Sequence, residues 1–242
     1  MSESYWTGAY FFLGWLLFQH LVSPLFVYRL HRGPDRYSFV PAECETYISE
    51  SSPAFLQHHN ELGLLGFSPV AASVLELSHS RTSFVLYKND LDQCVAMIMN
   101  ATNKLGETLV LDFTQRYEGG KHLSLTNSPV PSVYPGWNKK VMLRFPKVKK
   151  VTDLFHIFKN VRGKFNYENP IAFPSGRELQ MVEEFLNEEL QNLVDRGFMR
   201  IEGGKQRPTL LASYLISWRL TWPWKPILNL IANYRAASFA KA

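Results

Sequence analysis

Cysteine is scarce in this sequence: Cys44 and Cys94 are the only two among 242 residues. They lie far apart and match no spacing typical of a metal site or a redox motif. A single disulfide between them is one alternative, but two buried thiols in a reducing compartment are favoured. The sequence therefore predicts no metal centre and no disulfide-stabilised scaffold.

Known catalytic signatures are also missing. The patterns G-x-S-x-G, H-E-x-x-H, G-x-x-x-x-G-K-[ST] and G-x-G-x-x-G do not occur, so no reaction and no cofactor are predicted. His58 and His59 are adjacent, and on a helix they would point about 100° apart, which prevents them from sharing one metal ion. His79, His122 and His156 have no carboxylate or cysteine partner close to them in the sequence.

Charge is absent from one long segment near the N-terminus. Residues 5–28, YWTGAYFFLGWLLFQHLVSPLFVY, carry no formal charge at neutral pH. As a helix this segment would be about 36 Å long, enough to cross a hydrocarbon core of ~30 Å. Glu3 precedes it, and Arg29, Arg32 and Arg36 follow it, so the positive-inside bias predicts the N-terminus outside and the rest of the chain in the cytoplasm.

We therefore predict a transmembrane anchor over residues 1–32, placed in the inner membrane of the cell. A cleaved signal peptide is the alternative. Such a peptide needs a positive leading region, a shorter apolar core and a small-x-small cleavage site. This segment begins with an acid and ends in bulky residues and arginines, which favours an uncleaved anchor.

Residues 33–207 have the composition of a globular α+β domain. A helix is predicted over residues 52–65, where Ser52 suits the N-cap and Pro53 the first helical position. Apolar stretches separated by turn-forming residues predict an antiparallel meander of five to six strands, at 70–77, 82–88, 94–100, 107–115, 121–126 and 141–145.

Two further helices are predicted to close the domain and to cover one face of the sheet. The first spans residues 152–162 and ends at Gly163. The second begins with a capping-box spacing, Ser175 and Glu178, and ends at Gly197.

The last segment, residues 208–242, is apolar again but is interrupted by the stretch TWPWKP at residues 221–226. Arg219, Pro223, Lys225 and Pro226 disfavour a straight membrane span, because each central charge costs roughly 2.5–3.5 kcal/mol and each proline disrupts helical geometry. We predict two short arms, 209–220 and 226–234, joined by a bend in an interfacial or re-entrant hairpin. A kinked second span and a helix pair in the domain core are the alternatives. The residues expected at the membrane interface are Trp218, Trp222, Trp224 and Lys225.

The net charge of +5 arises mainly from the two ends of the chain. Within the domain, basic residues cluster where no acid intervenes, and we expect this cluster to bind anionic lipid or a protein partner. Pairing with the acidic face of the last domain helix is the alternative. Too few aromatic residues lie nearby to form a stacking platform, so nucleic acid is not predicted as a partner. The cluster consists of Lys139, Lys140, Arg144, Lys147, Lys149 and Lys150.

The loop at residues 127–137, NSPVPSVYPGW, is the best candidate for the rim of a pocket. It is long, stiffened by prolines and placed between two predicted strands, where loops often carry sites. The candidate rim residues are Asn127, Tyr134, Trp137 and, on the preceding strand, His122.

Three short motifs carry a resemblance to a known group of proteins. They are LGLLGF at 62–67, LSLTNSPVP at 123–131 and LFHIF at 154–158, within residues 54–162. With these motifs the chain resembles a family of bacterial proteins of planctomycete type, which have an N-terminal anchor, a single α+β domain and no assigned activity. The resemblance implies the same architecture and no catalytic residues.

The leading functional prediction is a membrane-anchored, non-catalytic cytoplasmic domain that binds a protein partner or anionic lipid headgroups. One alternative is an enzyme acting on a lipid or small metabolite at the membrane surface, for which a His close to an acid, such as His122 near Asp112, would be required. The other is a small-ligand sensor whose sheet and helices enclose an apolar cavity.

Overall fold

The chain forms two compact units. The computed structural model describes residues 2–77, 80–103, 106–165 and 169–240, so the predicted candidate His79 lies outside the described residues. We call the first unit the anchor unit; it comprises Met1–Arg36, Val130–Pro135 and Asn187–Leu228. We call the second the sheet unit; it comprises Tyr37–Pro129, Gly136–Leu186 and Asn229–Ala242.

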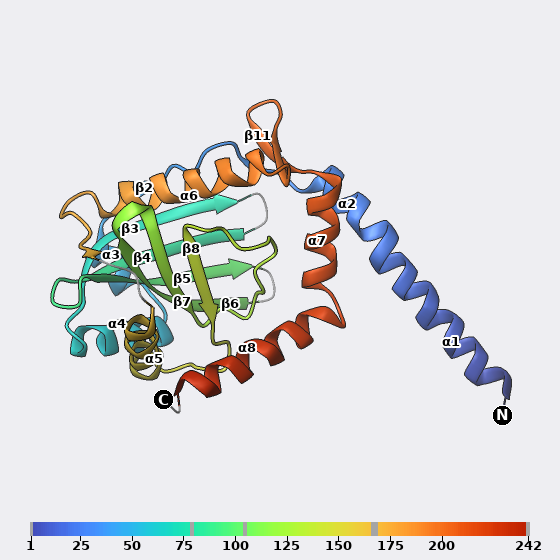
Figure 1. Cartoon of the computed structure of the whole chain (residues 1–242), viewed down its shortest axis with the longest axis horizontal. Coiled ribbons are helices and arrows are strands. Elements are labelled where there is room, and N and C mark those ends of the chain that lie inside the picture. The colour runs from blue at the N-terminus through green and yellow to red at the C-terminus, as the bar shows by residue number, and fades with distance from the viewer. Residues whose placement is uncertain (1, 78–79, 104–105, 166–168, 241–242) are drawn as a thin grey trace. The chain divides into compact units, whose positions relative to one another are not determined.

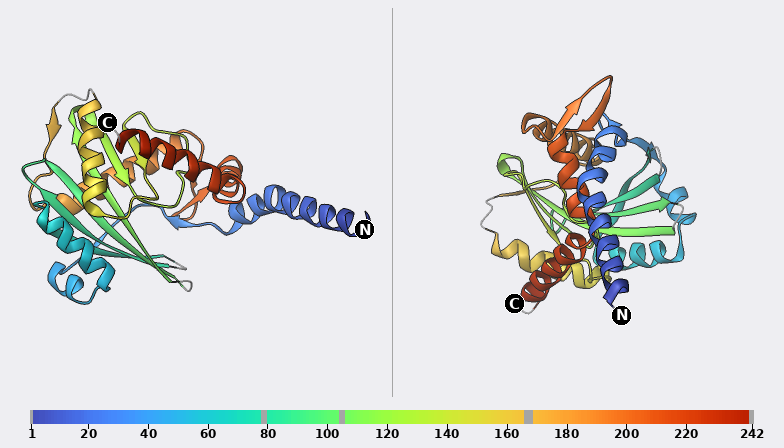
Figure 2. Two further views of the ribbon diagram at one scale, coloured as in Figure 1. Left: turned by 90° about the horizontal axis from the view of Figure 1, so that it is seen from below. Right: turned by 90° about the vertical axis from the view of Figure 1, so that its right-hand side faces the viewer.

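The anchor unit begins with a long apolar helix, as predicted. Helix α1 (Ser2–Leu17), the π-helical turn η1 (Phe18–Val22) and α2 (Ser23–Leu30) follow one another without a break, and Figure 2 shows them as one continuous rod. The π-turn ends two residues before Pro24, which has no N–H to donate and whose ring clashes with the preceding turn of an α-helix. Over Trp6–Leu30 the rod has 25 residues and is long and apolar enough to cross a membrane.

The rest of the anchor unit contains helix α7 (Leu210–Leu220) and a small sheet. Helix α7 packs along α2, and Thr209 caps it by accepting a hydrogen bond from the Ala212 N–H. The sheet has the order β1-β11-β10, with β1 at Gly33–Pro34, β10 at Met199–Ile201 and β11 at Lys205–Pro208. The sequence analysis missed the β10–β11 hairpin, although Gly203 and Gly204, both with positive φ, are a recognised signal for a tight turn.

The stretch TWPWKP forms a bend between two helices, as predicted. Helix α7 ends at Leu220 and α8 (Trp224–Ala240) begins after Pro223. Trp222 at the bend lies against helix α1: its ring centroid is 5.8 Å from that of Phe12 and 5.9 Å from that of Trp15. Its carbonyl accepts a 2.5 Å hydrogen bond from the Gln19 side chain. Helix α8 is longer than the predicted arm.

The sheet unit is built on an eight-stranded sheet. The strands lie in the order β2-β3-β4-β5-β6-β7-β8, and β9 pairs with β6. Six of them, β3 to β8, fall where the sequence predicted strands. The bounds are β2 Val40–Ala42, β3 Ser68–Leu77, β4 Ser80–Asn89, β5 Cys94–Asn103, β6 Gly106–Tyr117, β7 Lys121–Thr126, β8 Lys140–Arg144 and β9 Pro170–Ile171.

The prediction of a wholly antiparallel meander was wrong at its last strand. Strands β3 to β7 are antiparallel neighbours, but β8 runs parallel to β7, with His122 opposite Lys140. Parallel neighbours need a connection that returns the chain to the start of the previous strand, which a tight turn cannot do. Residues 127–139 provide that return.

One face of this sheet packs against helices α4 (Pro53–Leu64) and α5 (Val151–Lys164), which Figure 1 shows on the same side. Alternate strand residues point toward them and form the main core, because successive side chains of a strand face opposite ways. A short helix, α3 (Cys44–Ser49), precedes α4 and was not predicted. The fully buried strand residues of this core include Val85, Tyr87, Ile98, Leu111, Phe113, Leu123 and Leu125.

The predicted helix starts were right for α4 and wrong for α6 (Glu178–Asp195). Ser52 caps α4 by accepting from the Phe55 N–H, as predicted. Ser175 does not cap α6; its hydroxyl accepts a 2.9 Å hydrogen bond from the Lys88 ammonium instead. Gly176, with φ of +79°, turns the chain after Ser175, so the helix begins only at Glu178.

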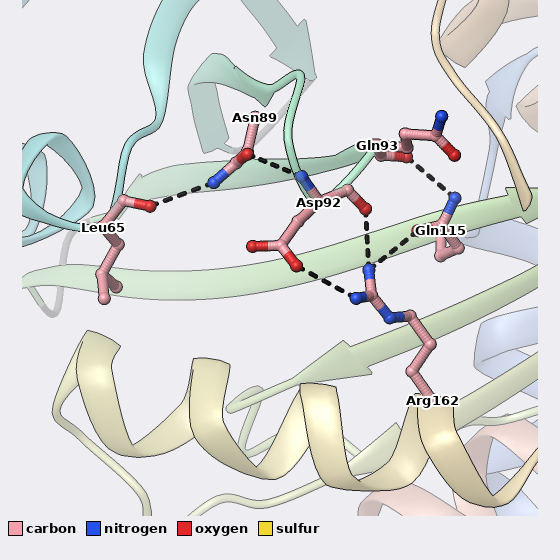
Figure 3. A network of polar contacts seen from close by, with 6 residues as sticks. All are labelled: Leu65, Asn89, Asp92, Gln93, Gln115 and Arg162. Carbon is pink, nitrogen blue, oxygen red and sulfur yellow. Dashed lines mark hydrogen bonds and ion pairs between the residues drawn. The ribbon is translucent and has the colours of Figure 1, made fainter.

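A polar network fixes the β4–β5 turn to the helices beneath it (Figure 3). Arg162 of α5 donates to the Asp92 carbonyl at 2.7 Å and to the Asp92 carboxylate at 3.0 Å. It also donates to Gln115, whose side chain is fully buried and in turn donates to the Gln93 carbonyl. On the other side, Asn89 donates to the Leu65 carbonyl at the end of α4. One guanidinium thus joins a turn, a central strand and a helix.

Arg162→Ala is expected to lower the free energy of unfolding by about 2 kcal/mol, because it removes charge-assisted hydrogen bonds and leaves the Gln115 oxygen unpaired. In a chain of this size that corresponds to a melting temperature lower by about 4–8 °C. The measurement is thermal unfolding of the full chain in lipid nanodiscs, followed by circular dichroism. The matched control is Arg177→Ala, an arginine with 58% side-chain exposure. Equal shifts in the two variants would contradict the assignment.

Candidate functional site: a cavity between the sheet and helix α6

The second face of the sheet carries a mixed set of side chains. Because strand residues alternate, the neighbours of the core residues point to the opposite side. On β4 and β5 most of these are apolar, Thr82 being polar, and on β6 and β7 they are polar. The residues of this second face that line a cavity are Thr82, Phe84, Leu86, Val95, Met97, Met99, Asp112, Thr114, His122, Ser124, Lys140 and Met142.

The first half of α6, residues 178–186, covers part of this face and borders a cavity of about 290 Å³. The sequence analysis expected helices on one face only. That expectation was wrong, because α6 presents an apolar side to the sheet and packs across the face opposite α5. The cover is completed by residues from outside the sheet: Tyr37, Phe39, Phe173, Met181, Val182, Phe185 and Leu186.

Specific contacts hold the cover in place. The Phe39 N–H donates a short hydrogen bond to the Glu183 carboxylate on α6, and the Phe39 ring meets Phe84 edge-on with centroids 4.9 Å apart. The Arg116 guanidinium lies 5.7 Å from the centroid of the Phe173 ring and donates to the Met181 sulfur at 3.1 Å. These contacts join α6 and both flanking segments to the strands, all within the sheet unit.

A line of hydroxyl groups leads to a carboxylate inside the cavity. The Thr114 hydroxyl donates to Asp112 Oδ1 at 2.7 Å, and Thr114 and Ser124 hydroxyl oxygens are 2.6 Å apart. A hydroxyl has one proton, and that of Thr114 is already given to Asp112, so Ser124 is the donor to Thr114. Within the described ranges of the chain, no hydrogen bond to the second oxygen of Asp112 is found.

Burial governs the electrostatics of Asp112. Desolvation raises the pKa of this carboxyl from 3.8 to about 6, against the opposing effects of the Thr114 hydrogen bond and the charge of Lys140. With this pKa, Asp112 is mainly ionised at neutral pH. The residue is half-buried and lines the cavity.

His122 forms one wall of the same cavity. It is 6% exposed, and its ring stacks on Phe185 with centroids 3.7 Å apart. Desolvation, aided by the nearby charges of Arg116, Lys140 and Lys139, lowers its pKa to about 3, so the imidazole is neutral. Among the described residues, its Nδ1 atom is buried and has no hydrogen-bond partner. His122 and Asp112 line one cavity, but no hydrogen bond joins them.

The predicted basic cluster is divided among different surroundings. Lys140 lines the cavity with its ammonium 5.2 Å from the Phe185 ring centroid, and Lys139 lies 5.7 Å from the Trp137 centroid. Arg144 donates to Asn229 of α8 at 3.0 Å and to the Ser128 carbonyl. The remaining three, Lys147, Lys149 and Lys150, are exposed around a shallow hollow beside Asp153 and His156.

The predicted rim residues are also separated. Trp137 stacks on Phe185, with centroids 5.6 Å apart, and so lies beside the cavity with His122. Asn127 is buried and accepts a 2.8 Å hydrogen bond from the Leu111 N–H, which is a structural role in the sheet. Tyr134 belongs to the anchor unit, where it packs against Phe198.

The residues predicted for a membrane interface lie at the α7–α8 bend. Trp218 and Trp224 meet edge-on with centroids 4.8 Å apart, and Trp218 and Trp222 are 41% and 49% exposed. Lys225 is exposed in the first turn of α8. The structure contains no membrane, so their interfacial role stays a prediction.

Most of the cavity is not predicted from the sequence. The sequence predicts His122, with Asp112 as its possible partner, and Lys140 as part of the basic cluster, but not Thr114, Ser124 or the methionines. The available signal was the alternation in β6 and β7, where LDFT and HLSL place a polar residue at every second position. In a sequence, the same pattern also fits a strand with one solvated face.

Comparison of the chain with protein-family models, curated proteins and solved structures gives no match. The resemblance to planctomycete-type proteins therefore stays a prediction.

The raised pKa of Asp112 predicts a pH-dependent cost to stability. The folded state keeps the proton up to about pH 6 and the unfolded state loses it near 3.8, so the wild type should lose stability relative to Asp112→Asn as the pH rises through this window. At pH 7.5 the variant should be more stable by about 1–3 kcal/mol. His122 is common to both proteins and cancels in the difference.

The measurement is the difference in melting temperature between the two full-length proteins in nanodiscs from pH 4 to 8. Asparagine can still accept the Thr114 hydrogen bond, which isolates the effect of charge. A wild type as stable as the variant at pH 7.5 would show that Asp112 is not held ionised in an apolar site.

Proposed function

We propose that this protein is a membrane-anchored domain that binds a small, mainly apolar molecule in the cavity between the sheet and α6. The observation that carries the proposal is the cavity, which lies inside the sheet unit and is lined by methionine, phenylalanine, leucine and valine with a few polar groups at one end. Small-molecule sites in proteins commonly have this character: apolar walls with a few placed polar groups.

The size of the cavity limits the ligand. Engineered cavities of about 150 Å³ in protein cores bind benzene, and ligand sites usually begin at about 300 Å³. The cavity of about 290 Å³ is therefore suited to a molecule of roughly twice the size of benzene. Four methionines line it, and their flexible, polarisable side chains adapt to ligands of different shape.

Anchoring by the N-terminal helix is the second part of the proposal. The rod over Trp6–Leu30 is long and apolar enough to span a bilayer, and Arg29, Arg32 and Arg36 at its end favour a cytoplasmic position for the sheet unit. The exposed lysines at 147, 149 and 150 would suit contact with anionic headgroups. A protein partner, the other prediction from sequence, has less support than the cavity, because the basic cluster is divided.

Binding can be tested through the methionines. Met97, Met99, Met142 and Met181 line the cavity, whereas Met199 lies in the anchor unit and is an internal reference. With the full chain labelled at the methionine methyl carbons and placed in nanodiscs, titration with 1-octanol should shift the four cavity signals in carbon–proton NMR spectra. The Met199 signal should stay in place. An apolar molecule entering the cavity must change the packing around these four methyl groups.

Val182→Trp should abolish the shifts, because the larger side chain fills the cavity from α6. Val40→Trp is the matched control, since Val40 is 72% exposed on the edge strand β2. Cavity methionine signals that do not respond to 1-octanol in the wild type, or that respond equally in Val182→Trp, would refute the proposed function.

An enzyme is the second candidate, and one observation favours it. Asp112 has a pKa of about 6 and faces a cavity, and a carboxylate with a pKa near neutral is suited to act as a general base. No nucleophile–base pair accompanies it among the described residues: Ser124 donates to Thr114, and neither is hydrogen-bonded to His122. Turnover of a bound apolar molecule that stops in Asp112→Asn would support this candidate over binding alone.

The orientation can be tested by cysteine labelling in a background without Cys44 and Cys94. Ser2→Cys should react with a membrane-impermeant maleimide on intact cells, whereas Glu50→Cys in the sheet unit should react only after lysis. The intact mass of the purified protein should include residues 1–30, which excludes cleavage as a signal peptide. Labelling of Glu50→Cys on intact cells would reverse the proposed orientation.

A further inference from the structure

The polar end of the cavity restricts the chemistry of the ligand further, on the basis of the proposed binding function. Two charged side chains line the cavity, Asp112 and Lys140. The Lys140 ammonium lies over the Phe185 ring, where the face of the ring stabilises its charge. The protein therefore stabilises the charge of Lys140 with an aromatic ring, and the question is what stabilises the charge of Asp112.

Asp112 is the less satisfied of the two. Among the described residues its one hydrogen bond comes from Thr114, and no ion pair within 4 Å involves it. Its neighbours on β4 and β5 in the same row of the sheet are apolar, Leu86 opposite Met97 and Met97 opposite Asp112. A carboxylate in such surroundings is costly unless a further donor or a positive charge meets it.

His122 adds an independent observation. It is more than nine-tenths buried, its Nδ1 atom has no partner among the described residues, and it lines the same cavity. A buried polar atom without a partner is uncommon in folded proteins and points to a missing one. His122 thus adds a polar atom without a partner to the wall of the cavity that Asp112 also lines.

We infer that the ligand of this cavity is an apolar molecule bearing a protonated amine, whose ammonium group pairs with the Asp112 carboxylate while its apolar part lies among Met97, Met99 and Phe84. A neutral donor such as a hydroxyl would satisfy one oxygen of Asp112 but would add no positive charge to the partial compensation that Lys140 gives. An ammonium satisfies both, because it donates hydrogen bonds and carries the opposite charge. A carboxylate ligand would place two like charges in an apolar space, which is unfavourable.

The proposed ammonium site also gives a role to the chain of hydrogen bonds that joins Ser124, Thr114 and Asp112. Ser124 donates to Thr114 and Thr114 donates to Asp112 Oδ1, so the protons of this line point toward the carboxylate. The line holds Asp112 in one orientation and leaves its other oxygen for the ligand. Preorganisation of this kind lowers the entropic cost of binding.

The test compares three ligands with the same chain length: octylamine, 1-octanol and octanoate. Each is titrated into methionine-labelled full-length protein in nanodiscs of neutral phosphatidylcholine, so that the lipid surface does not concentrate the charged ligands. At pH 8 octylamine should bind at least about tenfold more tightly than 1-octanol, which corresponds to about 1.4 kcal/mol. Octanoate should bind the most weakly.

Asp112→Asn should abolish the preference for octylamine, so that octylamine and 1-octanol bind with about equal affinity. Binding of 1-octanol should stay nearly unchanged. The matched control is Asp153→Asn, which removes an exposed carboxylate from α5 on the other side of the sheet and should keep the preference.

The outcomes separate the two proposals. If 1-octanol and octylamine bind equally in the wild type, or if octanoate binds most tightly, the inference about the amine is wrong and the proposed function stands. If Asp112→Asn keeps the full preference, the amine is recognised elsewhere and the role of Asp112 is refuted. If none of the three ligands shifts the cavity methionines, both proposals fail.

Discussion

The alternation of side chains along β6 and β7 is the constraint on which the sheet unit depends. Leu111, Phe113, Leu123 and Leu125 point into the core against α4 and α5, and they are fully buried. The residues between them necessarily point the other way. Since α6 covers part of that second face, the polar residues there are buried or half-buried rather than fully solvated. One pattern therefore builds the core and the polar end of the cavity at the same time.

This arrangement has an energetic consequence. A strand whose second face is enclosed is most stable when both faces are apolar. Here Asp112, Thr114, His122 and Ser124 occupy positions where valine or leucine would pack without desolvation cost. Proteins rarely keep an ionised carboxylate in such a place without a use for it, and sites of function are where such costs concentrate. The desolvation cost of these polar residues therefore supports a ligand, in addition to the cavity itself.

Much of the fold could be predicted from the sequence, because local signals determine it. The six strands β3 to β8 and the helices α4 and α5 follow from turn residues, caps and periodicity, and the uncharged N-terminal segment is indeed a long helix. The parallel pairing of β8 with β7 could not be derived, because it depends on where the connection through residues 127–139 leads in space. The prediction that Ser175 caps α6 was wrong for a similar reason. The Ser175 hydroxyl instead accepts a hydrogen bond from Lys88, a contact that depends on the tertiary structure.

The site was harder to predict than the fold, because the surroundings of its polar residues depend on the tertiary structure and not on the local sequence. A lysine cluster in sequence is a single patch only if the backbone keeps its members on one surface. Here alternation in β8 directs Lys140 to the cavity, and the end of the strand brings Arg144 to α8, where Asn229 accepts its hydrogen bond. The same alternation makes Asp112 and His122 neighbours of one cavity. What a side chain faces is decided by which helix covers its side of the sheet, and in this protein that helix is α6.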